Sequence, residues 1–161
     1  MSDNRDDRQA SATDLLEIER FIPYRLAVLS DWVSRSLANT YQARFGISIP
    51  EWRILANLAR EEPLSAGELS ERTNMDKPRV SRALQRMVRS QLIRRETDAN
   101  DQRVAVIRMS DRGRALYEQI APLALDWEQE LLSGLTDDER RDLNRLLDRL
   151  REQIERIRDS R

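Results

Sequence analysis

The sequence predicts a mainly α-helical fold that contains one small β-hairpin. Apolar residues recur at three- and four-residue steps through most of the 161 residues, which is the spacing of amphipathic helices. Residues 92–109 break this pattern, because two short strand-like runs flank the polar loop DANDQR. Ser65 and Thr136 each precede a glutamate by three residues, a capping box that marks the start of a helix.

The composition limits the size and the chemistry of the protein. A chain of 161 residues has single-domain length, and 28 basic and 29 acidic residues leave a net charge of −1. Cysteine and histidine are both absent, which excludes disulfides, thiol switches, Cys/His zinc sites and the usual general base. We therefore expect no metal, no cofactor and no enzymatic activity. A carboxylate-dependent enzyme is the remaining enzymatic alternative.

The N-terminal stretch MSDNRDDRQASATD is polar and mixed in charge, so we expect residues 1–13 to form a disordered arm. It has no apolar segment like that of a secretion signal, and no later segment has the length and apolarity that span a bilayer. We therefore expect a cytoplasmic protein without a membrane partner.

A long amphipathic helix is expected between Leu15 and Phe45, with Gly46 as its stop. Pro23 should begin a new helix or kink this one, because proline lacks an amide donor. The segment SIPEWRILANLAREE then predicts a second helix with Pro50 near its start.

Two short helices joined by a tight turn are predicted next. Ser65 and Glu68 form the capping box of a short helix that ends near Arg72. After the turn TNM, Asp76 can cap a further helix with Pro78 in its first turn. This is a helix-turn-helix arrangement.

The predicted hairpin follows this pair of helices directly. Its strands are expected at Leu92–Thr97 and Val104–Met109. A helix-turn-helix followed at once by a hairpin has the order of a winged helix. We place this winged helix-turn-helix lobe at residues 47–110.

The last part of the chain, residues 111–161, returns to helical spacing. Ser110 can cap a helix that contains Pro122 and ends at Gly134, and Thr136 opens the final helix. The final helix carries one apolar stripe, formed by Leu143, Leu146, Leu147, Leu150, Ile154 and Ile157. Because too little chain remains to cover such stripes, we expect residues 14–46 and 111–161 to be the dimerisation helices of a homodimer. A self-contained helical bundle is the alternative.

The helix that begins at Asp76 has one packing arc and one basic arc. The second arc, called the basic face below, consists of Arg79, Arg82, Arg86 and Arg89, with Ser81 and Gln85 beside them. Residues 77–108 hold nine basic residues and three acidic ones. An arginine face is usually just solvated. Followed by a hairpin with a basic tip, it fits duplex DNA, with the helix in the major groove and the loop at the minor groove.

The sequence resembles the MarR family of bacterial transcription regulators over about residues 15–158. The resemblance lies in the order of EWRILANL, SAGELSERTNMDKPRVSRALQRMVRSQLIRR and DANDQRVAVIRMSDRGRALY. The family's D-x-R signature appears as Asp101-Gln102-Arg103, and MSDRGRAL is similar to the family's LTxxG helix start. The resemblance implies that Arg103 enters the minor groove and that Asp101 orients an arginine. A simple ion pair at the hairpin tip is the alternative for these two residues.

Roles on the recognition helix also follow from the resemblance. It implies contacts to base edges by Arg79, Arg82 and Gln85, and contacts to phosphates by Lys77, Ser81 and Arg86. Arg89, Arg94 and Arg95 are expected to meet the DNA backbone or solvent.

The resemblance further implies a homodimer that represses transcription and is released by a small aromatic or anionic effector. Its two recognition helices would lie about one DNA turn, roughly 34 Å, apart on a pseudo-palindromic operator. Without cysteine, the thiol-oxidation switch of part of the family is excluded. The segments FIPYRLAVLSDWVSRSLANTY and IPEWRIL are similar to the branch that senses aromatic acids. The candidate ligand-binding residues are Arg25, Trp32, Ser36, Trp52 and Arg53, each of which also fits a core or interface role.

Three other functions compete with DNA binding. A winged helix can dock a protein partner without touching DNA, but such a module would not need a basic wing tip. A metal-sensing winged helix would need Cys or His ligands, and this chain has none. An enzyme is disfavoured by the missing His and Cys and by the lack of a glycine-rich phosphate loop among only four glycines.

Overall fold

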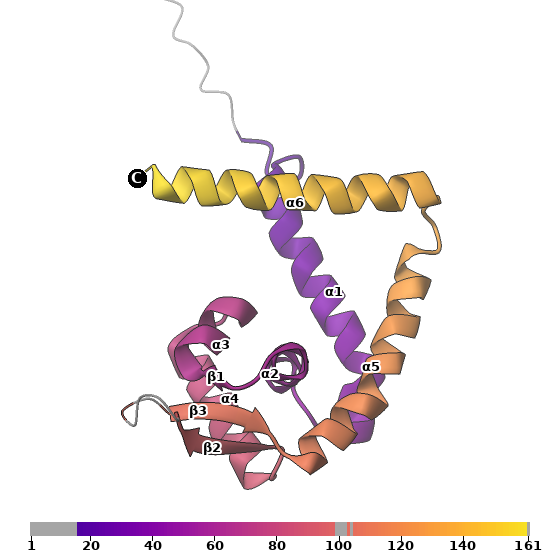
Figure 1. Ribbon diagram of the computed structural model, residues 1–161. Coiled ribbons are helices and arrows are strands. Elements are labelled where there is room, and N and C mark those ends of the chain that lie inside the picture. The colour runs from indigo at the N-terminus through magenta and orange to yellow at the C-terminus, as the bar shows by residue number, and fades with distance from the viewer. Residues whose placement is uncertain (1–15, 99–102, 104, 161) are drawn as a thin grey trace, which may run out of the picture. The chain divides into compact units, whose positions relative to one another are not determined.

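The computed structural model describes residues 16–98, 103 and 105–160. Within them the chain forms six α-helices and one three-stranded antiparallel sheet, which confirms the predicted fold class (Figure 1). The chain divides into two compact units, residues 1–34 and 35–161. The predicted arm at residues 1–13 lies outside the described residues.

Helix α1 spans Ile22–Phe45. It begins seven residues later than Leu15, where the apolar pattern starts, because Pro23 is tolerated in a first turn but not in a helix interior. Gly46 ends the helix with φ +69, a left-handed conformation that favours glycine. Of the two roles predicted for Pro23, the start of a helix is the one observed, and Gly46 stops the helix as predicted.

Helix α2 spans Ile49–Arg60 and has Pro50 in its first turn. Its N-terminus is held by Glu51, whose Oε2 accepts hydrogen bonds from the amide of Ser48 at 2.7 Å and from the Ser48 hydroxyl at 2.6 Å. Ile54 and Leu58 face the core and are almost fully buried.

The helix-turn-helix consists of α3, Ala66–Thr73, and α4, Lys77–Arg89. The predicted capping box is present, since the Ser65 amide donates to Glu68 Oε2 at 2.7 Å and the Glu68 amide donates to Ser65 Oγ at 3.2 Å. Asn74 turns the chain with φ 51, and the carboxylate of Asp76 accepts the amide of Arg79 at 2.7 Å. Both predicted helix starts are thus confirmed.

The sheet has the order β1-β3-β2, with β1 at Leu64–Ser65, β2 at Ile93–Thr97 and β3 at Ala105–Met109. Strands β2 and β3 pair from Ile93 opposite Met109 to Thr97 opposite Ala105, which confirms the predicted hairpin (Figure 1). Strand β1 was not predicted, because two residues are too short to show an alternating pattern.

The core lies where α2, α3, α4 and the sheet meet. Its largest fully buried side chains include Ile54, Leu58, Leu69, Leu84, Met87 and Ile107. The C-terminal part of α1 adds Tyr41, and α5 adds Ile120. The basic face of α4 is therefore held on a well-packed support.

Helices α5, Asp111–Leu132, and α6, Asp137–Asp159, complete the chain. The first turn of α5 approaches the segment between α4 and β2 so closely that a Cβ added at Gly113 would overlap the carbonyl oxygen of Leu92. Helix α5 continues through Pro122. The capping box of Thr136 and Glu139 opens α6, as predicted. None of the residues of α6 is buried within this single chain.

Candidate nucleic-acid interface

Helix α4 buries one side and exposes the other, as its sequence pattern predicts. Val80, Ala83, Leu84 and Met87 are buried, since they pack on the core. The exposed side carries the whole basic face, and Lys77 at the start of the helix is exposed as well. The helix therefore offers a continuous polar and positively charged surface to a partner.

Most of the positive charge on this surface is not neutralised by the protein. Within the described ranges, the side chains of Lys77, Arg79, Arg82 and Arg89 form no ion pair and no hydrogen bond with the rest of the chain. Arg94 and Arg95, which are exposed on β2, are unpaired in the same sense. A surface of unpaired guanidinium groups favours a polyanionic partner such as DNA.

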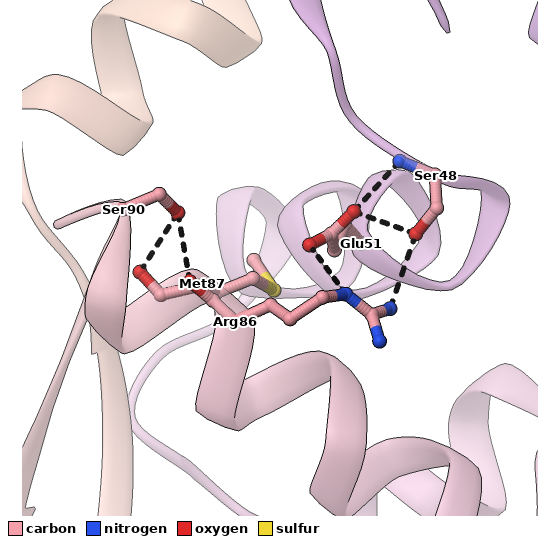
Figure 2. A network of polar contacts seen from close by, with 5 residues as sticks. All are labelled: Ser48, Glu51, Arg86, Met87 and Ser90. Carbon is pink, nitrogen blue, oxygen red and sulfur yellow. Dashed lines mark hydrogen bonds and ion pairs between the residues drawn. The ribbon is translucent and has the colours of Figure 1, made fainter.

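Arg86 differs from the other arginines of the basic face. Its Nε lies 3.2 Å from Oε1 of Glu51, and its Nη2 donates to Ser48 Oγ at 3.4 Å. Figure 2 shows the side chain of Arg86 reaching from α4 to the start of α2. This network was not predicted from the sequence, although Glu51 three residues after Ser48 is itself a capping-box spacing.

The wing lies beside α4 and contributes further charge. Arg108 on β3 pairs with Glu96 on β2, with Nε 3.1 Å from Oε2. Arg103 is exposed near the tip. Asp101 and Gln102 lie outside the described residues, so the expected orientation of an arginine by Asp101 stays a prediction.

A groove of about 420 Å³ separates α4 from the wing. Lys77, Ser81 and Leu84 line it from α4, Arg95, Ala105 and Ile107 line it from the sheet, and Ala66 and Gly67 close it at the start of α3. The helix and the wing are thus separate projections that can contact neighbouring parts of one duplex.

Two of the candidate ligand residues lie on α2. The Trp52 ring centroid is 5.6 Å from that of Tyr41 and 5.8 Å from that of Tyr117, onto which it stacks. Burial raises the pKa of Tyr41 to about 12, against a smaller lowering by the positive charge of Arg53. Arg53 itself donates to the carbonyl oxygen of Thr73 at 3.5 Å.

The other three candidates are on α1. Arg25 and Trp32 belong to the unit 1–34, where both are exposed, Trp32 to 64%. Ser36 lies in the second unit and lines an open hollow of about 500 Å³ with Thr40, Trp127 and Leu131. The structure thus brings Trp52 into an aromatic cluster with α1 and α5, while Ser36 lines a different surface.

No helix within residues 16–98, 103 and 105–160 is long and apolar enough to cross a membrane. In the same described ranges, no cluster of three or more acidic, His or Cys residues could hold a metal ion.

Comparison with known proteins identifies the family. The model of the MarR family matches residues 45–104. The HTH-type transcriptional regulator MgrA of Staphylococcus aureus is 30% identical over 115 residues, which cover 71% of this chain and 77% of MgrA. A MarR/EmrR family regulator from Acinetobacter sp. ADP1 has a similar crystal structure, with a TM-score of 0.80 and 26% identity over 88% of this chain and 99% of that one.

One of the similar structures contains DNA. It is a mutant MarR from E. coli in complex with operator DNA, with a TM-score of 0.73 and 26% identity over 84% of this chain and 97% of that chain. The exposed basic face of α4, the wing beside it and these relatives lead to one conclusion. This chain belongs to the MarR family and is a DNA-binding winged helix-turn-helix transcriptional regulator, not an enzyme.

Proposed function

We propose that this protein is a homodimeric repressor that binds a pseudo-palindromic operator and releases it when a small aromatic or anionic effector binds. The observation that carries the proposal is the exposed basic face of α4, where Arg79, Arg82 and Arg89 are unpaired within the described part of the chain. These charges gain most when they meet phosphates and base edges, because both are rich in hydrogen-bond acceptors.

The proposed DNA contacts divide into base reading and positioning. Arg79, Arg82 and Gln85 read base edges in the major groove, since they are exposed in the first and middle turns of α4. Lys77 and Ser81 bind phosphates, and both line the groove toward the wing. Arg103 inserts into the minor groove beside the tip, where the negative potential favours arginine.

The homodimer is proposed from apolar surface that the single chain leaves exposed. The stripe of α6 is between 39% and 56% exposed at Leu143, Leu146, Leu147, Leu150, Ile154 and Ile157. Exposed apolar faces of this size favour association in water, and we propose that a second copy covers this one. Residues 14–46 and 111–161 would then form the dimerisation region, and residues 47–110 the DNA-binding lobe.

The effector is proposed to be an aromatic carboxylate. The cluster of Tyr41, Trp52 and Tyr117 supplies apolar ring surface, and the guanidinium of Arg53 lies near enough to influence the pKa of Tyr41. Arg25, Trp32 and Ser36 would complete contacts in the dimer. The effector can release DNA only by binding more tightly to a dimer that does not fit the operator.

Selection of a random duplex library on the purified protein tests the core of the proposal. We expect enrichment of a pseudo-palindrome with half-sites about one turn apart, and a steep fall of affinity with salt. If no sequence is enriched, the basic face is a solvated surface or docks a protein, and the operator-binding proposal is wrong.

The selected duplex then serves to test the effector. Benzoate should release the duplex at concentrations where benzyl alcohol, which has the ring but no carboxylate, has no effect. Arg53→Gln should raise the benzoate concentration needed for release, measured relative to the variant's own affinity for the duplex without benzoate. Equal responses to both compounds would contradict recognition of a carboxylate.

A further inference from the structure

Glu51 and Arg86 connect the recognition helix to α2. The side chain of Glu51 is only 9% exposed, whereas that of Arg86 is 49% exposed. Glu51 Oε1 accepts from Nε of Arg86 at 3.2 Å, and Oε2 accepts both the amide and the hydroxyl of Ser48 (Figure 2). One buried carboxylate thus holds the start of α2 and a side chain of α4 together.

The same turn of α4 is also fixed from its C-terminal side. The hydroxyl of Ser90 donates to the carbonyl oxygens of Arg86 at 3.0 Å and of Met87 at 3.3 Å. Met87 is fully buried in the core. The backbone at Arg86 is therefore held by the core and the helix cap, while its side chain is held by α2.

This turn controls where the base-reading side chains point. Arg82 lies one helical turn before Arg86 on the same face, and Gln85 is its direct neighbour. A rotation of α4 about its axis would move Arg82, Gln85 and Arg86 together. The contact to Glu51 opposes this rotation, because moving the guanidinium away would leave Oε1 of a buried carboxylate without its partner.

Arg86 is poorly suited to bind a phosphate. Its Nε and Nη2 are occupied by Glu51 and Ser48, and the carboxylate of Glu51 neutralises its charge. This differs from the phosphate contact that the family resemblance implies for this position, and from the unpaired Lys77.

We propose that Glu51 and Arg86 are a positioning pair, which fixes the rotation of α4 and thereby sequence discrimination, while Arg86 makes no phosphate contact. The inference rests on the proposed base-reading role of Arg82 and Gln85. Glu51, a residue of α2 outside the basic face, would thus influence which DNA sequence the protein prefers.

The test compares Arg86→Gln with Lys77→Gln, using the selected duplex and a random duplex at several salt concentrations. Lys77→Gln should reduce the slope of log affinity against log salt by about 0.9 per bound protomer, since a phosphate contact is lost. Arg86→Gln should leave the slope unchanged, lower affinity for the selected duplex about tenfold and barely alter affinity for the random duplex. An equal loss of slope in both variants would overturn the proposal, as would unchanged affinity for the selected duplex in Arg86→Gln.

Glu51→Gln provides a second variant that keeps the oxygen that accepts the Ser48 amide. It should show the same loss of affinity for the selected duplex, with no change in the slope of log affinity against log salt. The double variant Glu51→Gln with Arg86→Gln should lose no more affinity than either single variant. Unchanged affinity of Glu51→Gln for the selected duplex would contradict the proposal. Thermal unfolding confirms that each variant is folded. Absence of sequence preference in the wild type would instead refute the proposed operator binding.

Discussion

The backbone amide of Met109 donates a hydrogen bond of 2.7 Å to Oε2 of Glu62, 47 residues earlier in the chain. Strand β1 pairs only Leu64 and Ser65 with β3, so the carboxylate of Glu62 serves as the acceptor beyond the end of β1. Its Oε1 also accepts from Nη2 of Arg114 at 2.5 Å. One side chain therefore joins the segment before β1, the base of the wing and the first turn of α5.

Replacing Glu62 should destabilise the fold. Glu62→Ala leaves the Met109 amide without its acceptor, which should lower the free energy of unfolding by about 1 to 3 kcal/mol. Glu61→Ala is the matched control, because Glu61 pairs with Arg72 on the surface and should contribute less. Urea unfolding of both variants checks the difference, and equal losses would contradict the proposed role of Glu62.

Gly113 should not tolerate a side chain. In Gly113→Ala the new Cβ would overlap the carbonyl oxygen of Leu92 and lie 2.9 Å from Met109 Cγ, so backbone must move. We expect a loss of more than about 2 kcal/mol in unfolding free energy. Gly67→Ala is the control, because the new Cβ would meet only Ser65 Oγ at 3.8 Å. This substitution should be neutral or stabilising. A neutral Gly113→Ala would refute this close approach.

Arg82 and Arg103 should affect DNA binding in different ways. Arg82→Ala should weaken the free energy of binding to the selected duplex by about 1 to 3 kcal/mol, because a base contact is lost, and should change binding to random DNA little. Arg103→Ala should weaken binding to all sequences and lower the salt slope. Arg112→Ala, which removes an exposed arginine of α5, controls for loss of charge. Equal losses on both duplexes would reject base reading by Arg82.

The apolar stripe of α6 should determine the oligomeric state. Leu147→Lys combined with Leu150→Lys places two charges in the proposed interface and should convert the dimer to a monomer. Asp148→Lys changes the charge of the same helix by the same amount away from the stripe and should leave the dimer intact. Analytical ultracentrifugation distinguishes the two states. A dimer that survives both changes would place its interface elsewhere.

Tyr41 should make the stability of the fold fall at high pH. Because burial raises the pKa of Tyr41 to about 12 in the folded state, the unfolded chain loses this proton first, near pH 10. The contribution is complete below about pH 10 and is lost as pH rises from there toward about 12. Urea unfolding at about pH 9 and about pH 11 should show that the free energy of unfolding falls less between these pH values in Tyr41→Phe than in the wild type. The same fall in both proteins would exclude Tyr41 as its source.

The features predicted correctly from the sequence are those that depend on residues close together in the chain. The capping residues Ser65, Asp76 and Thr136 act within three residues, and the buried and exposed sides of α4 follow from helical spacing alone. The start of α1 was missed by seven residues, because the apolar pattern continues past Pro23 into a segment that is not helical.

The features missed are contacts between distant segments. The pair of Arg86 with Glu51 spans 35 residues, and the bond from Met109 to Glu62 spans 47. Nothing in the local pattern distinguishes Arg86 from Arg82, since both lie on one face of the same helix. The difference arises because packing in the core brings the N-terminus of α2 beside Arg86.

The contact between Gly113 and Leu92 has a mechanical consequence. The Ser110 amide also donates to Leu92 O at 3.0 Å, and the Ser110 hydroxyl donates to Gln91 O at 2.6 Å. The segment that follows α4 is therefore bonded at two points to Ser110, the residue that caps α5. A tilt of the first turn of α5 would therefore pull on Gln91 and Leu92, which come just after the recognition helix.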